Sequence, residues 1–388
     1  MRYPLEGIRV LELARVLAGP WVGQVLADLG ADVIKVESPK GDETRKWGPP
    51  FVEGKNKQLD SAYFHSCNRG KRSIVLNFND ETDLETAHKL VEKSDVLIEN
   101  FKVNGLKKFN LDYKFLSRIN PQLIYCSITG FGQTGPYAEK LGYDFIIQAL
   151  SGIMDLTGEP DREPQKMGVA FADIFTGLYG VIAIQSALRL RETSGKGQHI
   201  DLSLMDSMTA VLANQASNFF VSGVSPKRMG NQHPNIVPYQ VFPVIDGHLI
   251  IAVGNNEQFK RLCQALGMEE IYLLENYKDN NKRVKNRKKL IKLIESKTIT
   301  FKKQKLKILL EKNNVPVGSV NELSEVFNDP QIQFRKLKIS MPHKKAQKEA
   351  TYGVRTPIIF SDSKLSLSKG VPLLGEHNNE ILEEIKKK

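Results

Sequence analysis

The sequence predicts an α/β fold in which helices cover both faces of a mainly parallel sheet, with a smaller α+β domain beside it. In the first half of the chain, short apolar strands alternate with helical segments, a pattern typical of parallel sheets. Between residues 223 and 238 the composition shifts to Gly, Pro, Asn and His, as in a linker. The chain has 388 residues, which exceeds the size of one ordinary hydrophobic core.

Buried strands account for most of the first half. Five mostly apolar segments have the length of strands and end at polar or turn residues: 7–13, 31–37, 72–77, 95–99 and 123–128. Helical patterns lie between them, at about 20–29, at 81–93 and in a segment that ends near residue 119. Ligands of parallel sheets bind beyond the carboxyl ends of the strands, so the residues after each strand are the first candidates for a site.

The second half is predicted to be mainly helical at first and then mixed. Residues 174–191 form a long apolar helix candidate, and residues 201–220 form another. A hairpin is expected over residues 240–253, with its turn at Asp246 and Gly247, and helices follow to about residue 313. The hairpin and the helices that follow it form the predicted smaller α+β domain.

The composition is that of a globular chain, with 41% hydrophobic and 26% charged residues. No uninterrupted apolar run approaches the roughly 18 residues that span a bilayer, so no membrane association is expected. The N-terminal residues lack the pattern of a signal or transit peptide, which predicts a cytoplasmic protein. The three cysteines are scattered, which argues against a disulfide framework or a cysteine-based zinc site.

The chain is basic, with a formal net charge of +11. Much of the surplus lies in residues 282–312, where apolar residues recur at helical spacing, and this indicates a solvated helix face. No zinc-finger spacing or aromatic RNA-binding signature accompanies the charge, so nucleic acid is not the expected partner.

Several familiar catalytic motifs are missing. The chain has no GxxxxGK[ST] loop for ATP or GTP, no GxGxxG after the first strand, and no GxSxG nucleophile turn. Its seven histidines form no close pair suited to a metal, so no metal site is expected.

Basic residues near the predicted carboxyl edge of the sheet favour a ligand with several phosphates. As a set they suit such a ligand, although each alone is more often surface charge: Arg15, Lys40, Arg45, Lys71 and Arg72. Two glycine-containing segments follow strands, one with Gly130 and Gly132, the other with Gly254, Asn255 and Asn256. Each is either a tight turn or backbone that approaches a ligand, and local reasoning leaves both interpretations open.

Asp173 begins the long apolar helix. From position alone, it is more readily interpreted as a helix cap than as a catalytic residue, because an aspartate there accepts hydrogen bonds from the first amides.

Many motifs, in order, resemble those of the family III CoA-transferases over essentially the whole chain. They are Pro4–Leu11, Gly19–Pro20, Leu29–Glu37, Asn68–Ser73, Glu99–Phe101, Gly142–Asp144 and Thr193–Gln198. The resemblance implies a Rossmann-like large domain built from residues 1–222 and 320–388, a small domain at 223–319 with linkers, and an interlocked homodimer.

The resemblance also implies roles for individual residues. Asp173 becomes the expected nucleophile, which replaces its interpretation as a cap. Expected CoA contacts are Val16, Leu17, Lys71, Arg72, Asn100, Phe101 and Tyr143. Ser38 stands where a family member has Arg, so Arg45 or Lys40 is expected to hold the adenosine phosphate. Gly254, Asn255 and Asn256 replace an all-glycine loop, and with Gly130 and Gly132 they are expected lid or amide-donor positions.

The implied reaction moves CoA from an acyl-CoA to a free carboxylic acid, with acyl-CoA as substrate and no permanently bound cofactor. A carboxylate of ordinary pKa, about 4, would be ionised at neutral pH and would need no general base. Segments 158–160, 236–240, 253–259 and 286–288 resemble members that use succinyl-CoA and a dicarboxylic acid. The alternative is an α-methylacyl-CoA racemase of the same family, but these need a His where this chain has Tyr143.

Overall fold

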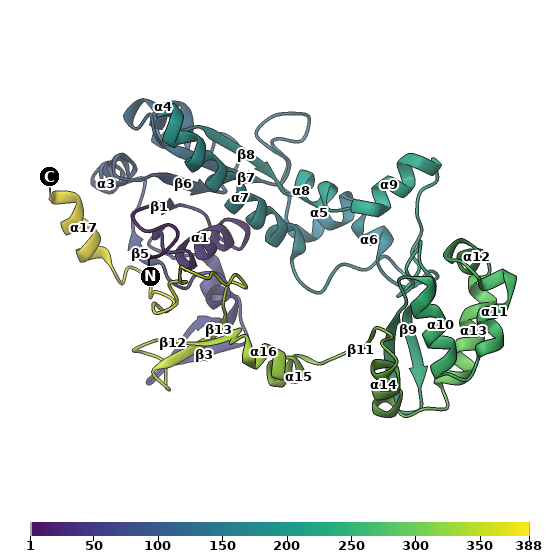
Figure 1. Ribbon diagram of the computed structural model, residues 1–388. Coiled ribbons are helices and arrows are strands. Elements are labelled where there is room, and N and C mark those ends of the chain that lie inside the picture. Colours follow the sequence, from purple (N-terminus) through teal and green to yellow (C-terminus); the bar gives the residue numbers. More distant parts are fainter. Residues whose placement is uncertain (1, 388) are drawn as a thin grey trace. The chain divides into compact units, whose positions relative to one another are not determined.

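The computed structural model describes residues 2–387 and divides the chain into two compact units (Figure 1). Unit 1 comprises Met1–Ile153, Lys166–Gly223 and Pro330–Lys388, and unit 2 comprises Met154–Gln165 and Val224–Asp329. Relative to the predicted small domain at 223–319, unit 2 also includes the short segment Met154–Gln165 and ten further residues at its C-terminal end.

A six-stranded parallel sheet forms the centre of unit 1, in the order β5-β2-β1-β6-β7-β8. Its strands are β1 (Arg9–Glu12), β2 (Asp32–Glu37), β5 (Arg72–Val75), β6 (Val96–Glu99), β7 (Ile124–Thr129) and β8 (His199–Ser203). The predicted α/β fold with a parallel sheet is therefore confirmed, including five of the six strands.

Both faces of this sheet are buried. Along β1, Val10 packs into the core with α1 (Ala18–Asp28) and α7 (Phe171–Ser194), and Leu11 packs into the core on the other face. That second core contains apolar residues of α3 (Glu81–Glu92), α4 (Tyr113–Ile119) and α17 (Asn378–Lys386), as Figure 1 illustrates. Burial on both faces explains why these strands read as continuous apolar runs.

The sixth strand, β8, was not predicted. Residues 201–220 were expected to form one helix, but the structure has β8, then α8 (Leu204–Ala210) and α9 (Ala213–Ser222). As an edge strand, β8 leaves alternate side chains exposed, so its sequence alternates between polar and apolar residues.

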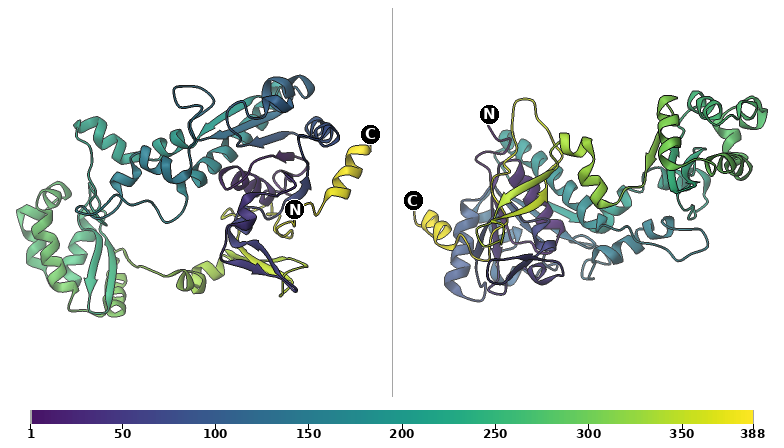
Figure 2. Two further views of the ribbon diagram at one scale, coloured as in Figure 1. Left: turned by 180° about the vertical axis from the view of Figure 1, so that it is seen from behind. Right: turned by 90° about the horizontal axis from the view of Figure 1, so that it is seen from below.

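The end of the chain returns to the sheet of unit 1 (Figures 1 and 2). The amide of His377 donates to the carbonyl of Ser73 over 3.0 Å, which holds the start of α17 against β5. A C-terminal hairpin also lies beside an N-terminal one, because the amide of Gln347 donates to the carbonyl of Glu53 over 2.9 Å. The two hairpins are β3 (Phe51–Glu53) with β4 (Gln58–Ser61), and β12 (Lys338–Pro342) with β13 (Ala350–Val354).

Shorter elements complete unit 1. They are η1 (Glu43–Lys46), α2 (Ala62–His65), η2 (Lys107–Phe109), α5 (Asp144–Leu150) and α16 (Pro330–Phe334), with α6 (Ile153–Leu156) at the boundary of the units.

Unit 2 has its own core around a three-stranded antiparallel sheet, in the order β11-β10-β9. The predicted hairpin is confirmed as β9 (Tyr239–Val244) and β10 (Gly247–Ala252), whereas β11 (Val317–Ser319) was not predicted. Its helices are α10 (Asn256–Ala265), α11 (Glu269–Leu273), η3 (Glu275–Tyr277), α12 (Asn280–Lys285), α13 (Arg287–Thr298), α14 (Lys303–Lys312) and α15 (Leu323–Asn328).

Helix α7 is the longest element that carries a candidate site residue, with 24 residues. Within residues 2–387 it is the one helix long and apolar enough to cross a membrane by length and composition, which the sequence analysis did not anticipate. Core helices of water-soluble proteins meet the same criterion, and α7 packs on α1 within unit 1.

Candidate active site

Loops at the carboxyl ends of β1, β6 and β7 surround a cleft of about 430 Å³ in unit 1. Seven of the residues singled out from the sequence line it: Arg15, Val16, Asn100, Phe101, Gly130, Tyr143 and Asp173. The position agrees with the rule that parallel sheets bind ligands beyond the carboxyl ends of their strands.

Asn100 joins two of these loops. Its side-chain oxygen accepts from the amide of Arg15 over 2.9 Å, and its side-chain nitrogen donates to the carbonyl of Arg15 over 2.7 Å. The guanidinium of Arg15 lies 5.6 Å from the ring centre of Phe101 and pairs with Glu43 at 3.0 Å. One asparagine thus fixes the backbone that leads into α1.

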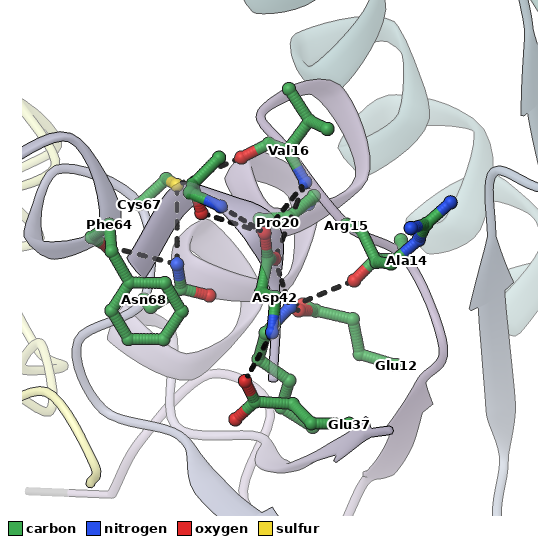
Figure 3. Close-up of polar contacts among 12 residues, drawn as sticks. Glu12, Ala14, Arg15, Val16, Pro20, Glu37, Asp42, Phe64, Cys67 and Asn68 are labelled. Atoms are coloured by element: carbon green, nitrogen blue, oxygen red, sulfur yellow. Dashed lines mark hydrogen bonds and ion pairs between the residues drawn. The ribbon is translucent and has the colours of Figure 1, made fainter. Parts of the chain in front are cut away.

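Val16 has a strained backbone in this loop. Its φ of 70° lies in the left-handed region, which β-branched residues rarely adopt. Its amide donates to Asp42 over 3.3 Å, and the thiol of Cys67 donates to its carbonyl over 3.6 Å (Figure 3). The strain is therefore maintained by contacts beneath the loop. The neighbouring Leu17 is buried and does not line the cleft.

Asp173 lies in the first turn of α7 and faces the cleft. It does not cap the helix, since Ala170 occupies the cap position without a side-chain hydrogen bond. Asp144 of α5 caps α7 instead, because its carboxylate accepts from the amide of Ala172 over 2.8 Å. The backbone amide of Ala18, at the start of α1, favours the ionised form of the Asp173 carboxylate.

Burial, together with the nearby carboxylate of Asp144, raises the pKa of Asp173 to about 7, against the opposing effect of the Ala18 amide. The expectation that Asp173 is fully ionised at neutral pH is therefore wrong. Its carboxyl group is a mixture of both forms near pH 7, because a carboxyl group is half protonated at its pKa.

The two glycines after β7 differ in position. A side chain on Gly130 would lie 2.6 Å from the Cα of Gly142, so this glycine allows two backbone segments to meet at the wall of the cleft. Gly132 has a φ of 90° and its amide donates to the hydroxyl of Thr129 over 2.9 Å. That amide is already bonded, which favours the tight-turn interpretation for Gly132.

Lys71 and Arg45, which were expected to hold phosphate, are buried in ion pairs and do not face the cleft. Lys71 has no exposed side-chain surface, and its amine lies 2.9 Å from the carboxylate of Glu12. Arg45 is also buried, between Glu37 at 2.7 Å and Asp60 at 2.6 Å. Neither residue lines the cleft, so neither is available there to a phosphate.

Arg72 is likewise occupied elsewhere. Its guanidinium pairs with Asp32, Glu380 and Glu384, which ties α17 to the sheet. Of the other basic positions, Lys40 does not line the cleft, and Arg15 does.

Lys71 belongs to a buried charge network under the β1–α1 loop (Figure 3). Glu12 lies between the amines of Lys35, at 3.2 Å, and Lys71, and Lys35 also pairs with Asp42 at 3.1 Å. Since Asp42 accepts from the amide of Val16, the network supports the strained residue at the edge of the cleft.

Sequence reasoning missed two cations that do line the cleft, Lys102 and Lys140. Both are exposed, and the amine of Lys140 lies 3.7 Å from the ring centre of Tyr137. Lys102 directly follows Asn100 and Phe101, which the strand pattern had indicated as site residues. Its position just after β6 could therefore have identified it as a candidate.

The glycine-containing loop of unit 2 is firmly held. The amide of Gly254 donates to Gln258 over 2.7 Å, and the side chain of Asn255 caps α10 by accepting from the amide of Gln258. Asn256 accepts from the buried guanidinium of Arg283 over 2.9 Å. The lid role of residues 254–256 stays a prediction. Within residues 2–387, no cluster of three metal-binding side chains occurs.

Comparisons with known proteins cover nearly the whole chain. The family model described as CoA-transferase family III matches residues 5–378. The chain is 53% identical to succinate–glutarate CoA-transferase of Agrobacterium fabrum, over 98% of this chain and 96% of that protein. It is 42% identical to succinyl-CoA:glutarate CoA-transferase of Mus musculus, over 98% of this chain and 86% of the mouse protein.

A solved structure is similar to the whole fold. The crystal structure of a CAIB/BAIF family protein from Brucella suis superposes with a TM-score of 0.89 at 57% identity, and the match covers all of both chains.

Proposed function

Because this chain belongs to CoA-transferase family III and is therefore a CoA-transferase, we propose that it moves CoA from succinyl-CoA to a dicarboxylic acid such as glutarate, through covalent intermediates on Asp173. The observation that carries the proposal is the position of Asp173 at the wall of the cleft, beside the loops after β1, β6 and β7. The names of relatives at 53% and 42% identity supply the substrate class.

The proposed chemistry is a chain of acyl exchanges. The Asp173 carboxylate attacks the thioester carbonyl, which gives an aspartyl anhydride and CoA thiolate. The thiolate attacks the aspartyl carbonyl, which releases succinate and leaves an aspartyl-CoA thioester. The acceptor carboxylate attacks that thioester, and the released thiolate then attacks the acceptor's acyl carbonyl, which restores Asp173.

Ala18, Lys102 and Lys140 each have a proposed part in this scheme. The amide of Ala18, which favours the ionised form of Asp173, is proposed to stabilise the charge that develops on the reacting oxygens during attack. Thioester is exchanged for thioester, so the reaction requires neither ATP nor metal. For the phosphates of CoA we propose Lys102 and Lys140, because these exposed cations line the cleft and the buried Arg45, Lys71 and Arg72 do not.

The direct test is an assay of succinyl-CoA against a panel of acids, with CoA transfer followed by mass spectrometry. Glutarate or a related dicarboxylate is expected to be the best acceptor. Exchange of an α-hydrogen with deuterated water, without acid-dependent CoA transfer, would contradict the proposal and support the racemase.

The pH dependence should report the titration of Asp173. Because only the carboxylate attacks, kcat/KM at low substrate is expected to rise about tenfold per pH unit below pH 7 and to level off above it. Asp144→Asn keeps an oxygen to cap α7 but removes a negative charge, so the rise should move to lower pH. This variant also distinguishes the titration of Asp173 from that of Glu99. Burial raises the pKa of Glu99 to about 7 as well. A profile that does not move in Asp144→Asn would assign the titration to another group.

We also propose that the chain forms a homodimer. Leu178, Tyr179, Ile182 and Leu190 of α7 are apolar and exposed in the single chain, and Ile182 is 59% exposed. Contiguous exposed apolar surface is typical of interfaces. Light scattering is expected to give a dimer for the natural protein and more monomer for Ile182→Glu. A natural protein that is monomeric at micromolar concentration would contradict this.

A further inference from the structure

Glu99 is a buried acid at the last position of β6, and the proposed chemistry does not use it. Its side chain is 5% exposed and does not line the cleft. The carboxylate turns back onto the chain that leaves the strand, where it accepts from the amide of Phe101 over 2.8 Å. A side-chain bond of this kind to the backbone two residues further on fixes the direction in which the chain leaves the strand.

The turn that Glu99 holds forms part of the cleft wall, because Asn100 and Phe101 both line the cleft. Asn100 in turn binds both backbone groups of Arg15, and the guanidinium of Arg15 lies 5.6 Å from the ring centre of Phe101. One carboxylate outside the cleft therefore sets the position of two loops, the one after β6 and the one after β1. A loop that is already held in its binding conformation loses less entropy when the ligand binds.

The surroundings of Glu99 allow its charge to change near neutral pH. In the register of β6 and β7, Glu99 lies opposite Ser127, whose hydroxyl is 2.9 Å from Nε2 of His199 on β8. Burial raises the pKa of Glu99 to about 7, and the carboxylate of Asp201 on β8 adds to this effect. The hydroxyl of Ser127 and the amide of Phe101 act in the opposite direction, because both favour the ionised form.

The titratable groups around Glu99 keep their charge at neutral pH. Burial lowers the pKa of His199, so this ring is neutral at pH 7, and Tyr113 of α4 stacks on it. Burial, together with the Glu99 carboxylate, raises the pKa of Tyr125 and the pKa of Cys126 on β7, so both side chains are neutral as well. Of Glu99, His199, Tyr125 and Cys126, Glu99 is therefore the one whose charge changes around pH 7.

The charge of Glu99 determines how firmly it holds the turn. A hydrogen bond to an ionised acceptor is about twice as strong as one between neutral groups, so the carboxylate holds the amide of Phe101 more firmly than the protonated acid does. A carboxyl group with a pKa of about 7 is roughly one-tenth ionised at pH 6 and roughly nine-tenths ionised at pH 8. The order of the turn should follow this change.

We propose that Glu99 is a positioning residue for CoA. Its ionised carboxylate holds the turn of Asn100 and Phe101 in the conformation that binds CoA, so acyl-CoA binding tightens as Glu99 loses its proton. The inference rests on the proposed function, because it takes the cleft as the CoA site. It adds a pH-dependent binding step that is separate from the attack by Asp173.

Calorimetric titration of the protein with CoA at pH 6 and at pH 8 tests this inference. Glu99→Gln keeps a side-chain oxygen and nearly the same shape, but it is neutral at every pH. We expect it to weaken CoA binding about fivefold at pH 8 and less than about twofold at pH 6, where the natural side chain is itself mostly protonated. Because Asp173 titrates in both proteins, its contribution cancels in the ratio of their dissociation constants.

Two further variants show which group is responsible. Ser127→Ala removes a hydroxyl that favours the ionised form of Glu99, so the tightening of CoA binding should move to higher pH. Glu92→Gln is the matched control, since Glu92 is exposed at the last residue of α3, and it should leave CoA binding unchanged at both pH values. A pH dependence that does not move in folded Ser127→Ala would overturn the assignment to Glu99.

Stability and binding are expected to respond in opposite directions in Glu99→Gln. The pKa of Glu99 is raised in the folded state, so folding favours its protonated form and stability is lost as pH rises through about 7. Glu99→Gln should therefore melt at a higher temperature than the natural protein at pH 8 while binding CoA less tightly. Equal dissociation constants at pH 8 would overturn the inference, as would a weakening that is the same at pH 6 and pH 8, since that indicates a structural role alone.

The assay of CoA transfer distinguishes this failure from failure of the proposed function. If the natural protein binds CoA but transfers it to no acid, the proposed function fails, and the dissociation constants of Glu99→Gln still decide the inference. Undetectable binding of CoA to the natural protein would overturn both.

Discussion

Replacing Asp173 with asparagine is expected to reduce CoA transfer by at least about a thousandfold while the protein stays folded. The amide of asparagine has nearly the shape of the carboxyl group but cannot form the proposed anhydride. The measurement is the rate of CoA transfer from succinyl-CoA to glutarate, with care that the asparagine does not deamidate. Trapping the natural protein during turnover with hydroxylamine or borohydride should label Asp173, as peptide mapping by mass spectrometry can show.

The same variant should be more stable than the natural protein at high pH. The pKa of Asp173 is raised in the folded state, so folding favours its protonated form and stability is lost as pH rises through about 7. Asparagine carries no charge at any pH. Its melting temperature should therefore exceed that of the natural protein at pH 8, and the difference should shrink at pH 5.

Asp206→Asn is the matched control, since Asp206 also lies in the first turn of a helix, α8, but is exposed. It should change neither activity nor the pH dependence of stability. Full turnover by Asp173→Asn, or a label on another residue, would end the proposal for Asp173.

The sheet could be predicted because its strands are buried on both faces and therefore carry an unmistakable apolar pattern. Asp173 could be located as a helix-start acid, but its role came from the resemblance, since Asp144 performs the capping that the pattern assigned to Asp173. Asp144 can cap α7 because α5 lies against α7, and no local sequence pattern predicts that contact.

The ion pairs of the predicted phosphate ligands Arg45, Lys71 and Arg72 could not be foreseen for a similar reason. Their place after a strand could be read from the sequence, but the acids that face them could not. Glu12 and Lys35 are partners because β1 and β2 pair in a register that sets these two residues opposite each other. Register and neighbour order are properties of the assembled sheet.

The contrast between Lys71 and Lys102 tests this distinction between buried and cleft lysines. Lys71→Met removes one of the two amines beside the buried carboxylate of Glu12, so it is expected to destabilise unit 1 by about 3 kcal/mol. Lys102→Met is expected to leave stability unchanged and to raise the KM for succinyl-CoA about fivefold, as the loss of about 1 kcal/mol of binding would.

Urea unfolding followed by the two tryptophans, both in unit 1, measures the first effect, and steady-state kinetics measures the second. Because the substitution is the same in both variants, only the surroundings of each lysine can separate their outcomes. The sequence-based prediction, that Lys71 binds CoA, requires the opposite pattern, a raised KM in a Lys71→Met protein of undiminished stability. That result would show that the charge network beneath Val16 opens to admit the phosphates, since a lysine enclosed by Glu12, Asn68 and the carbonyl of Pro20 cannot otherwise reach them.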